Sequence, residues 1–132
     1  MSNDLTTTEL EEVKQIVCDE VDAIADILLE ASHAIHKNPE LNFEEYFAHE
    51  TLTGILEDQG LSPQRGAYDL ETAFEASVGD EGVCVAVLCE YDALPDIGHA
   101  CGHNIIGTAG LGAGIAASKV AGRLGGTLRI LG

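Results

Sequence analysis

The sequence predicts an α/β fold in one domain, and three observations support this class. Two amphipathic helical patterns occupy the first 58 residues, two short strand patterns follow over 72–88, and a small-residue helical pattern then leads to a last strand at 127–131. A strand, a helix and a further strand form a βαβ unit, whose two strands run parallel through a right-handed crossover. The 132 residues, 45% of them hydrophobic, suffice for one modest core and argue against disorder.

The first helical pattern predicts one long amphipathic helix. Apolar residues recur every three or four positions between Leu10 and Ile35, with acidic residues on the other side. Asn38-Pro39 ends this helix, because proline disfavours a helical residue ahead of it. A second helix is expected over 44–58, with Gly60 as its stop. Its inward side chains are expected to be Phe47, Leu52, Ile55 and Leu56.

The strand patterns predict two antiparallel neighbours followed by a parallel one. The run over 72–78 alternates apolar and polar residues, and the run over 82–88 is continuously apolar, as in a strand buried on both faces. Gly79 to Gly82 fits a hairpin turn between them. Pro63 to Gly66 is expected to be a turn. A helix over 104–122 then carries the chain to the strand at 127–131, which is expected to run parallel to the strand at 82–88.

Three glycines in the last predicted helix invite a nucleotide-binding interpretation, which the sequence does not support. Gly112 and its neighbours fit G-x-G-x-x-A, but a dinucleotide fingerprint opens a helix directly after a strand, whereas these glycines lie inside a helix. No acidic residue follows Asp96, although such a fingerprint needs one about twenty residues on. Close packing of the helix on the sheet is the favoured reason for Gly110, Gly112 and Gly114.

The charge of the chain limits its partners. Six Lys and Arg residues against 23 Asp and Glu residues give a net charge of −17. Nucleic acid and anionic membranes both attract positive charge, so neither is expected as a partner. The favoured interpretation is a heavily solvated surface of the kind found in proteins of a high-salt cytoplasm, and an acidic tail is the lesser alternative.

The cysteines indicate a reducing compartment. The first twenty residues contain no long apolar stretch, so no secretory signal is expected and the cytoplasm is the expected location. Cys84 and Cys89 lie in the apolar strand region and are expected to be buried and inert. No transmembrane span is expected either, since the apolar region near 105–120 is short and glycine-rich.

The segment from Glu90 to Asn104 carries the candidate chemistry. Cys101 and His103 lie two residues apart, and a thiolate with an imidazole suits zinc or another late divalent metal. The alternative is a loop with a buried thiol and a helix-capping residue, and both interpretations stay open. Asp92 is either a turn residue before Pro95 or the carboxylate that fixes the tautomer of a ligating imidazole. Glu90 is a weaker candidate of the same kind.

The remaining histidines are assigned mainly structural roles. His99 is a possible third metal donor, but three ligands within five residues would strain the loop, so a supporting position is favoured. His33 and His36 end the first helix, where they suit its negative C-terminal dipole, and a catalytic role for either is the lesser alternative. His49 is expected to be an exposed helix residue.

Two separated segments resemble the M20 metallopeptidase and amidohydrolase family. The residues at 91–104 read Y-D-A-L-P-D-I-G-H-A-C-G-H-N, and those at 35–45 read I-H-K-N-P-E-L-N-F-E-E. Both are similar to motifs of the cysteine-containing amidohydrolase branch, which includes aminobenzoyl-glutamate hydrolases and M20 domain-containing dipeptidases. The residues at 126–132 resemble the strand that leads to the glutamate pair of the family. The match extends from the first helix to the last residue.

The resemblance implies a fold, an activity and a set of metal ligands. The fold is a three-layer, zinc-peptidase-like mixed sheet with flanking helices. The activity is hydrolysis of small N-acyl amino acids or dipeptides by a homodimer that holds two divalent ions, Zn²⁺ or Mn²⁺. The resemblance places metal ligands at Cys101 and His103 and the supporting aspartate at Asp92. The position of Glu90 corresponds to a ligand histidine in other branches.

The same resemblance implies that residues 1–132 form only the N-terminal part of the catalytic domain. The general-base glutamate, further ligands and the inserted dimerisation domain all follow this region in the family. We therefore expect little or no activity and weak metal binding from these residues alone. Two other classes stay open. One is a non-catalytic remnant or regulatory fragment of the fold, and the other is a thiol-based redox module that uses Cys101.

Overall fold

The computed structural model describes residues 5–132, which form four α-helices, one 3-10 turn and four strands. Their order follows the predicted alternation of helices and strands. The bounds are α1 Thr7–Ala23, α2 Ala25–Lys37, α3 Tyr46–Asp58, β1 Gln64–Arg65, η1 Ala67–Asp69, β2 Phe74–Val78, β3 Cys84–Leu88, α4 His103–Leu124 and β4 Thr127–Leu131. The short strand β1 lies where the sequence predicts a turn.

The four strands form one mixed sheet in the order β1-β2-β4-β3. Strand β4 runs antiparallel to β2 and parallel to β3, with Ala76 opposite Ile130 on one side and Val87 opposite Ile130 on the other. The parallel crossover through α4 is therefore confirmed. The predicted hairpin between β2 and β3 is wrong, because β4 inserts between these strands. The turn at Gly79 to Gly82 instead carries the chain across the end of β4.

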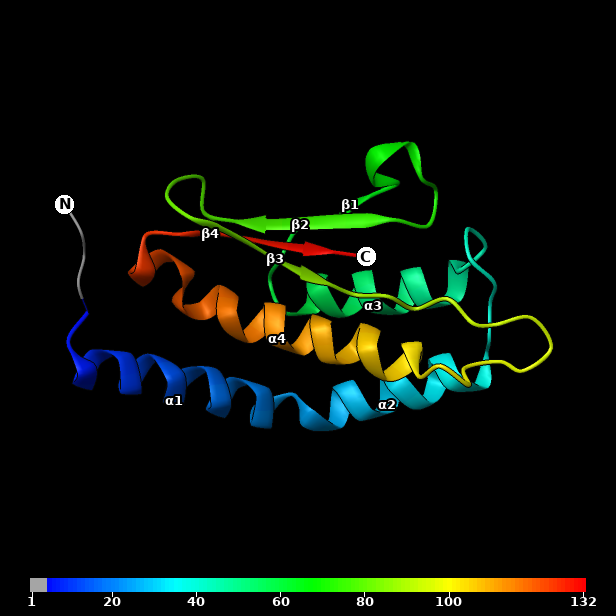
Figure 1. Ribbon diagram of the computed structural model, residues 1–132, viewed down its shortest axis with the longest axis horizontal. Coiled ribbons are helices and arrows are strands. Elements are labelled where there is room, and N and C mark those ends of the chain that lie inside the picture. Colours follow the sequence, from blue (N-terminus) through cyan, green and yellow to red (C-terminus); the bar gives the residue numbers. More distant parts are fainter. Residues whose placement is uncertain (1–4) are drawn as a thin grey trace.

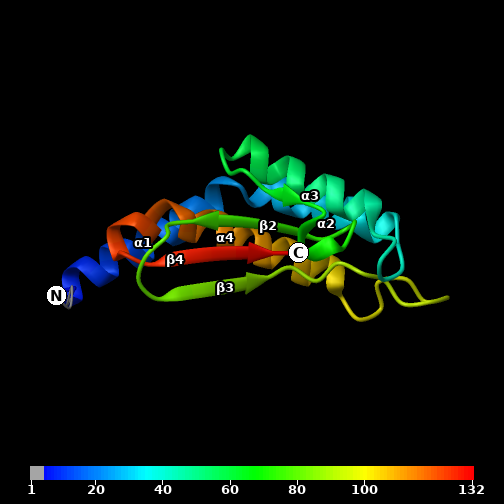
Figure 2. The same cartoon turned by 90° about the horizontal axis from the view of Figure 1, so that it is seen from above.

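The helices lie on one side of the sheet and form two further layers (Figure 1). Helix α4 packs on β3 and β4 with one face and on α1 and α2 with the other. Viewed from above, the opposite face of the sheet carries no α-helix among residues 5–132, and only the short 3-10 turn η1 lies on that side (Figure 2). The predicted α/β class, with a mixed sheet and flanking helices, is confirmed.

The single long helix predicted at the N-terminus is two helices. Helix α1 begins at a capping box in which Thr6 and Glu9 bond each other, and it ends at Ile24, whose backbone has left the helical conformation. Helix α2 starts at the next residue and continues over the same surface of α4. The apolar period runs on across the break with Ile24 buried, so the sequence pattern cannot reveal it.

Helix α3 buries a different face from the one predicted. Leu52 and Leu56 are fully buried as expected, but Phe47 is 40% exposed. His49 is 8% exposed and lies beside the ring of Phe74, so its predicted exposure is wrong. His49 stands three residues before Leu52 on the inward face, and there it replaces an apolar side chain.

The glycines of α4 allow close packing, as predicted. A methyl group added at Gly110 would lie 2.5 Å from the carbonyl oxygen of Leu88 in β3, and one at Gly114 would lie 2.6 Å from the side chain of Ile130 in β4. Gly112 faces the other layer, where an added methyl group would meet Leu28 of α2 at 2.5 Å. Helix α4 is long and apolar enough to span a membrane, but in this fold it packs between the sheet and two helices.

Strand β3 is an exposed edge, although its apolar sequence predicts burial on both faces. Val85 is 56% exposed and Leu88 is 59% exposed. Cys84 is exposed as well, so the prediction of a buried thiol is wrong there and confirmed only for Cys89, which is 3% exposed. Among residues 5–132, β3 has a neighbouring strand on one side only, and one face of the sheet carries no α-helix (Figure 2), so these side chains stay exposed.

Candidate metal centre

The predicted site lies on the loop that leaves β3 and enters α4, beyond the carboxyl end of a parallel strand (Figure 1). Two backbone hydrogen bonds hold the start of this loop. The N–H of Cys89 donates to the carbonyl of Leu131 at 2.7 Å, and the N–H of Ala93 donates to the carbonyl of Glu40 at 2.7 Å. The second bond ties the loop to the segment between α2 and α3, so both segments that resemble M20 motifs meet here.

The imidazole of His103 is held between two carboxylates. Its Nδ1 lies 2.6 Å from Oδ1 of Asp92, and its Nε2 lies 3.1 Å from Oε2 of Glu90. His103 is the first residue of α4, and its side chain is 20% exposed. In the tautomer that carries its proton on Nδ1, the ring donates to Asp92 and the lone pair of Nε2 faces the Glu90 carboxylate, so a cation between them would contact both groups. Asp92 is thus within hydrogen-bond distance of the ring, and its tautomer-fixing role stays a prediction.

Cys101 lies at the surface, two residues before His103 in the chain. It is exposed and precedes Gly102, which caps α4 in the left-handed conformation with φ of 81°. Glycine adopts that conformation without strain, and it turns the chain from the loop into the helix. The thiol is therefore accessible rather than buried.

Residues 5–132 do not hold a complete metal site. They contain no group of three or more His, Cys, Asp or Glu residues arranged to bind an ion. The structure brings Glu90, Asp92 and His103 together and leaves Cys101 at the adjoining helix start. The donor types suit a late divalent metal, but a stable site needs three or four donors.

His99 is buried and makes no hydrogen bond or ion pair with Glu90 or Asp92 within residues 5–132. It is 7% exposed, and its ring stacks on that of His36 with centroids 6.3 Å apart. Burial, followed by the nearby His36, lowers the pKa of His99, so the ring is neutral near pH 7. Neither ring nitrogen has a hydrogen-bond partner within residues 5–132. A supporting role for His99 therefore stays a prediction. His33 is exposed and lies outside the site.

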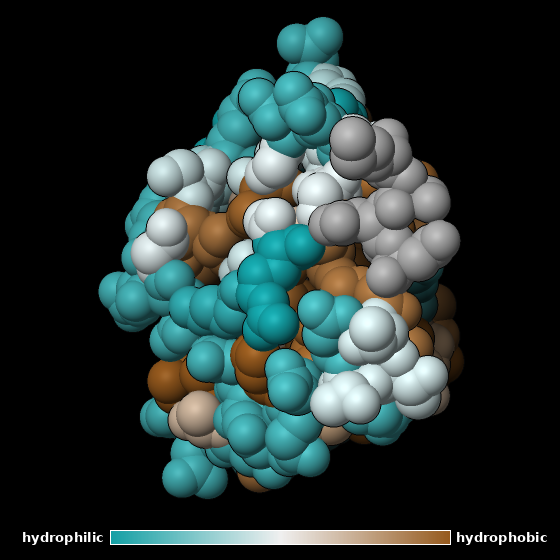
Figure 3. Space-filling model, turned by 90° about the vertical axis from the view of Figure 1, so that its left-hand side faces the viewer, coloured by the Kyte–Doolittle hydropathy of each residue, from teal (hydrophilic) through white to brown (hydrophobic). Residues whose placement is uncertain are grey.

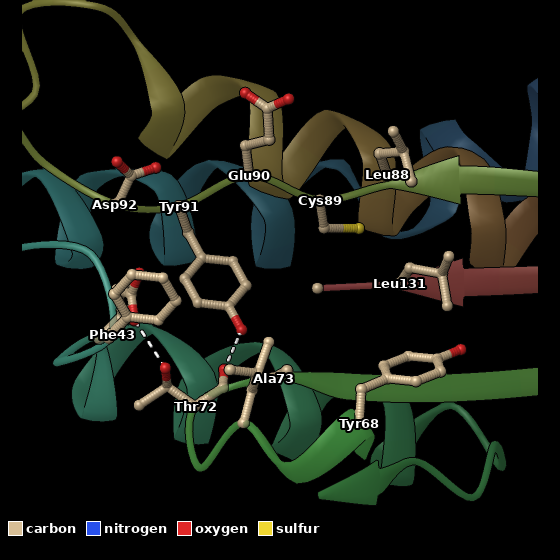
Figure 4. A pocket seen from close by; sticks show the side chains of 13 residues that line it. Phe43, Tyr68, Thr72, Ala73, Leu88, Cys89, Glu90, Tyr91, Asp92 and Leu131 are labelled. Carbon is tan, nitrogen blue, oxygen red and sulfur yellow. Dashed lines mark hydrogen bonds between the residues drawn. The ribbon is translucent and has the colours of Figure 1, made fainter. Parts of the chain in front are cut away.

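A cavity of about 340 Å³ opens on the other side of the same segment, at the carboxyl ends of β3 and β4. Figure 4 shows Tyr91 pointing into this cavity, whereas Glu90 and Asp92 point the opposite way. The Tyr91 hydroxyl donates to the carbonyl of Thr72, and the Thr72 hydroxyl donates to Oε2 of Glu45 at 2.6 Å. Sequence reasoning missed this buried network. The one signal in the sequence was the similarity of the segment that contains Glu45 to an M20 motif. That similarity does not predict which residues Glu45 contacts.

Comparisons with known proteins find similar sequences within longer enzymes. The chain is 39% identical over 120 residues to the Xaa-Arg dipeptidase of Mus musculus, a match that covers 83% of this chain and 28% of that protein. It is 32% identical over 142 aligned positions to one of the subunits of the p-aminobenzoyl-glutamate hydrolase of Escherichia coli K12, covering 93% of this chain and 30% of the relative. The chain thus spans less than a third of the length of these curated relatives.

Solved structures show the same fold. A putative aminohydrolase from methicillin-resistant Staphylococcus aureus superposes with a TM-score of 0.73 at 16% identity, over 89% of this chain and 34% of that one. A dinuclear metal-binding peptidase of the M20 family from Bacillus subtilis superposes with a TM-score of 0.73 at 24% identity, over 83% of this chain and 35% of that one. No family model matches the sequence.

Proposed function

This chain is homologous to part of the M20-type hydrolases and dipeptidases, and from that premise we propose that it forms the N-terminal part of a metal-dependent amide hydrolase domain. One observation carries the proposal. Nδ1 of His103 lies 2.6 Å from Asp92, and the exposed Cys101 precedes His103 by two residues, on the loop beyond the end of a parallel strand. Open α/β sheets place their functional groups at that end.

In the proposed centre, Nε2 of His103 and Sγ of Cys101 bind a divalent ion, Zn²⁺ or Mn²⁺. Asp92 keeps the proton on Nδ1 and directs Nε2 toward the ion. The Glu90 carboxylate lies 3.1 Å from Nε2, so it faces the same position and is a further candidate donor. The remaining donors, the second ion and the general base come from outside residues 1–132.

When bound, the metal polarises the amide carbonyl and lowers the pKa of water. The chain's own contribution is to orient the imidazole of His103 through its contact with Asp92. The names of the relatives indicate the substrate class, since one acts on Xaa-Arg dipeptides and another on an N-acylated glutamate. We propose small dipeptides or N-acyl amino acids as substrates.

Exposed apolar surface supports a larger domain around these residues. Val83 is 77% exposed and Val85 is 56% exposed, and they line an apolar cavity of about 290 Å³ with Leu124 at the end of α4. Figure 3 shows apolar surface between hydrophilic side chains on this end of the molecule. An unpaired apolar edge strand promotes aggregation unless another element covers it. We propose that further strands and helices of the same domain cover β3 in a homodimeric enzyme.

The proposed location is the cytoplasm. All four cysteines are free, and three of them are exposed. Exposed thiols persist in a reducing compartment, whereas an oxidising one drives them to pair. The same condition keeps Cys101 available as a metal ligand.

Cobalt binding tests the metal centre directly. Titration of the metal-free chain with Co²⁺ should give weak binding with a thiolate-to-cobalt absorption band. Cys101→Ser should remove the band, and His103→Ala should lower the affinity by about tenfold or more. Cys84→Ser is the matched control, since Cys84 is equally exposed and lies outside the site. An unchanged band in Cys101→Ser would contradict the proposed ligand.

Hydrolysis assays test whether residues 1–132 catalyse the reaction without residues from outside this range. We expect no measurable hydrolysis of dipeptides or N-acyl amino acids by residues 1–132 with Zn²⁺ or Mn²⁺. Chelator-sensitive hydrolysis by the purified chain would contradict the proposal that a general base outside these residues is needed. The alternative, a non-catalytic remnant of the fold, predicts that neither Cys101→Ser nor His103→Ala alters Co²⁺ binding.

A further inference from the structure

The segment 90–92 carries both carboxylates that hold His103, yet its backbone is not hydrogen-bonded. The bonds from Cys89 to Leu131 and from Ala93 to Glu40 flank it. Between these two points, residues 90–92 make no backbone hydrogen bond with any residue in the described part of the chain. Helix α4 approaches from one side, where Gly107 faces the carbonyl of Glu90. Side chains must therefore fix the segment from the other side.

Tyr91 supplies that second attachment. Extended backbone sends alternate side chains to opposite sides, so Glu90 and Asp92 face His103 while Tyr91 faces away (Figure 4). The Tyr91 side chain is 5% exposed, and its ring lies parallel to that of Phe74, with centroids 6.1 Å apart and an angle of 3° between the planes. Its hydroxyl donates to the carbonyl of Thr72.

The acceptor end of this attachment is itself fixed. The Thr72 hydroxyl donates to Glu45 at 2.6 Å, and both residues are buried. Glu45 stands at the start of α3, and Phe74 begins β2. Burial raises the pKa of Tyr91, so the phenol stays protonated and remains a donor throughout the neutral range. The attachment thus joins the His103 segment to two elements on the far side of the cavity.

We propose that Tyr91 is a positioning residue, whose hydroxyl and ring hold residues 90–92 so that Asp92 and Glu90 face the two nitrogens of His103. Loss of the hydroxyl removes one hydrogen bond that holds the segment. The carboxylates of Glu90 and Asp92, on either side of Tyr91, then shift together. The expected effect of Tyr91 on metal binding rests on the function proposed above. The expected effect of Tyr91 on the His103 ring does not, because the two carboxylate contacts exist without a metal.

The test compares Tyr91→Phe with wild type in metal-free protein. Phenylalanine keeps the ring on Phe74 and removes only the hydroxyl. We expect the ¹⁵N shifts of the His103 ring to change and the Nδ1 proton to exchange with water about tenfold faster, as the Asp92 bond weakens. Tyr46→Phe is the matched control, since it removes a hydroxyl that bonds Glu71 at 3.2 Å on the surface. Identical His103 signals in all three folded proteins would overturn the proposal.

A second variant and a second measurement keep the outcomes separate. If Tyr91→Phe does not give a folded protein, Thr72→Val removes the bond to Glu45 and leaves the acceptor of Tyr91 in place. It should change the His103 signals in the same direction, and unchanged signals would overturn the proposal. Co²⁺ affinity should fall about tenfold in Tyr91→Phe relative to Tyr46→Phe. If wild type binds no Co²⁺, the metal centre fails, and the ring signals still decide the role of Tyr91.

Discussion

At the scale of single residues, a few buried polar side chains depart from the simple apolar pattern. His49, Glu45 and His99 are all 7–8% exposed. Sequence periodicity assigns His49 to the surface because histidine is polar, whereas the fold places it against Phe74. The pairing of Asp92 with His103 was predictable, because the motif gave each residue its role. The pairing of His36 with His99 joins residues 63 positions apart through tertiary packing, and no local pattern encodes it.

His49 should make the protein less stable in mild acid. Burial, with Arg65 acting in the same direction, lowers its pKa below the ordinary value of 6.5 and outweighs the opposing effects of the Ala73 backbone, Glu50 and Glu45. The unfolded state therefore binds a proton more readily, and stability falls as pH drops below about 6.5 toward the folded-state pKa. His49→Gln should show a smaller loss of unfolding midpoint between about pH 7 and 5 than wild type. An equal loss in both proteins would contradict the assignment.

The four cysteines should differ sharply in reactivity. Cys18, Cys84 and Cys101 are exposed, whereas burial raises the pKa of Cys89 to about 12. Thiolates are the reactive form, so iodoacetamide near neutral pH should modify three residues in the native protein and Cys89 only in denaturant. Peptide mass spectrometry after labelling identifies the sites. Native labelling of Cys89 would show that α4 opens away from the end of β3.

At the scale of elements, the sequence predicts whether a segment forms a helix or a strand better than it predicts which strands pair with each other. The bounds of β4 agree with the prediction, and those of α4 differ by one or two residues. The apolar run of β3 predicts a strand, but its predicted burial depends on a neighbour that residues 5–132 do not supply. The hairpin turn predicted for Gly79 to Gly82 has suitable residues, yet the later strand β4 takes the place between β2 and β3. Pairing partners of this kind are set by the whole sheet.

Two glycines of α4 should respond oppositely to alanine. Gly110→Ala places a methyl group 2.5 Å from the Leu88 carbonyl and should destabilise the protein by about 1–3 kcal/mol, since neither backbone can move freely. Gly122 lies in the same helix, but a methyl group there would meet no atom within 4 Å outside the backbone of that helix. Gly122→Ala should therefore stabilise the protein by about 0.5–1 kcal/mol through helix propensity. Urea unfolding of both variants measures the difference. Equal effects would contradict the tight contact between α4 and β3.

At the scale of the whole molecule, the large negative charge has the main effect on how stability depends on conditions. The net charge of −17 lies on a chain with only six Lys and Arg residues, and the ion pairs include exposed ones such as Lys14 with Glu11. Mutual repulsion of the carboxylates disfavours the compact state, and salt screens it. The acidity was predictable from composition, and the α/β fold class from the order of the helical and strand patterns. The uncovered face of the sheet was not predictable, because neither shows which surfaces pack together.

Salt should therefore stabilise the protein. The thermal midpoint should rise by several degrees between about 0.1 and 0.5 M KCl through screening alone. Adaptation to a high-salt cytoplasm predicts a further rise in the molar range, where screening of exposed charges is already complete. Calorimetry in KCl separates the two effects. A midpoint that does not respond to salt would contradict both explanations.

One of the two inner strands of the sheet is the last strand to be made among residues 5–132. Strand β4, at 127–131, lies between β2 and β3, and both need it as their partner. While the chain is being synthesised, β3 therefore leaves the ribosome before its partner strand, and β2 has only the two-residue strand β1 to pair with. The helices can gather early, but the sheet must wait until some fifty residues after β2 have emerged. A nascent chain of this kind depends on protection of its β-forming segments until β4 arrives.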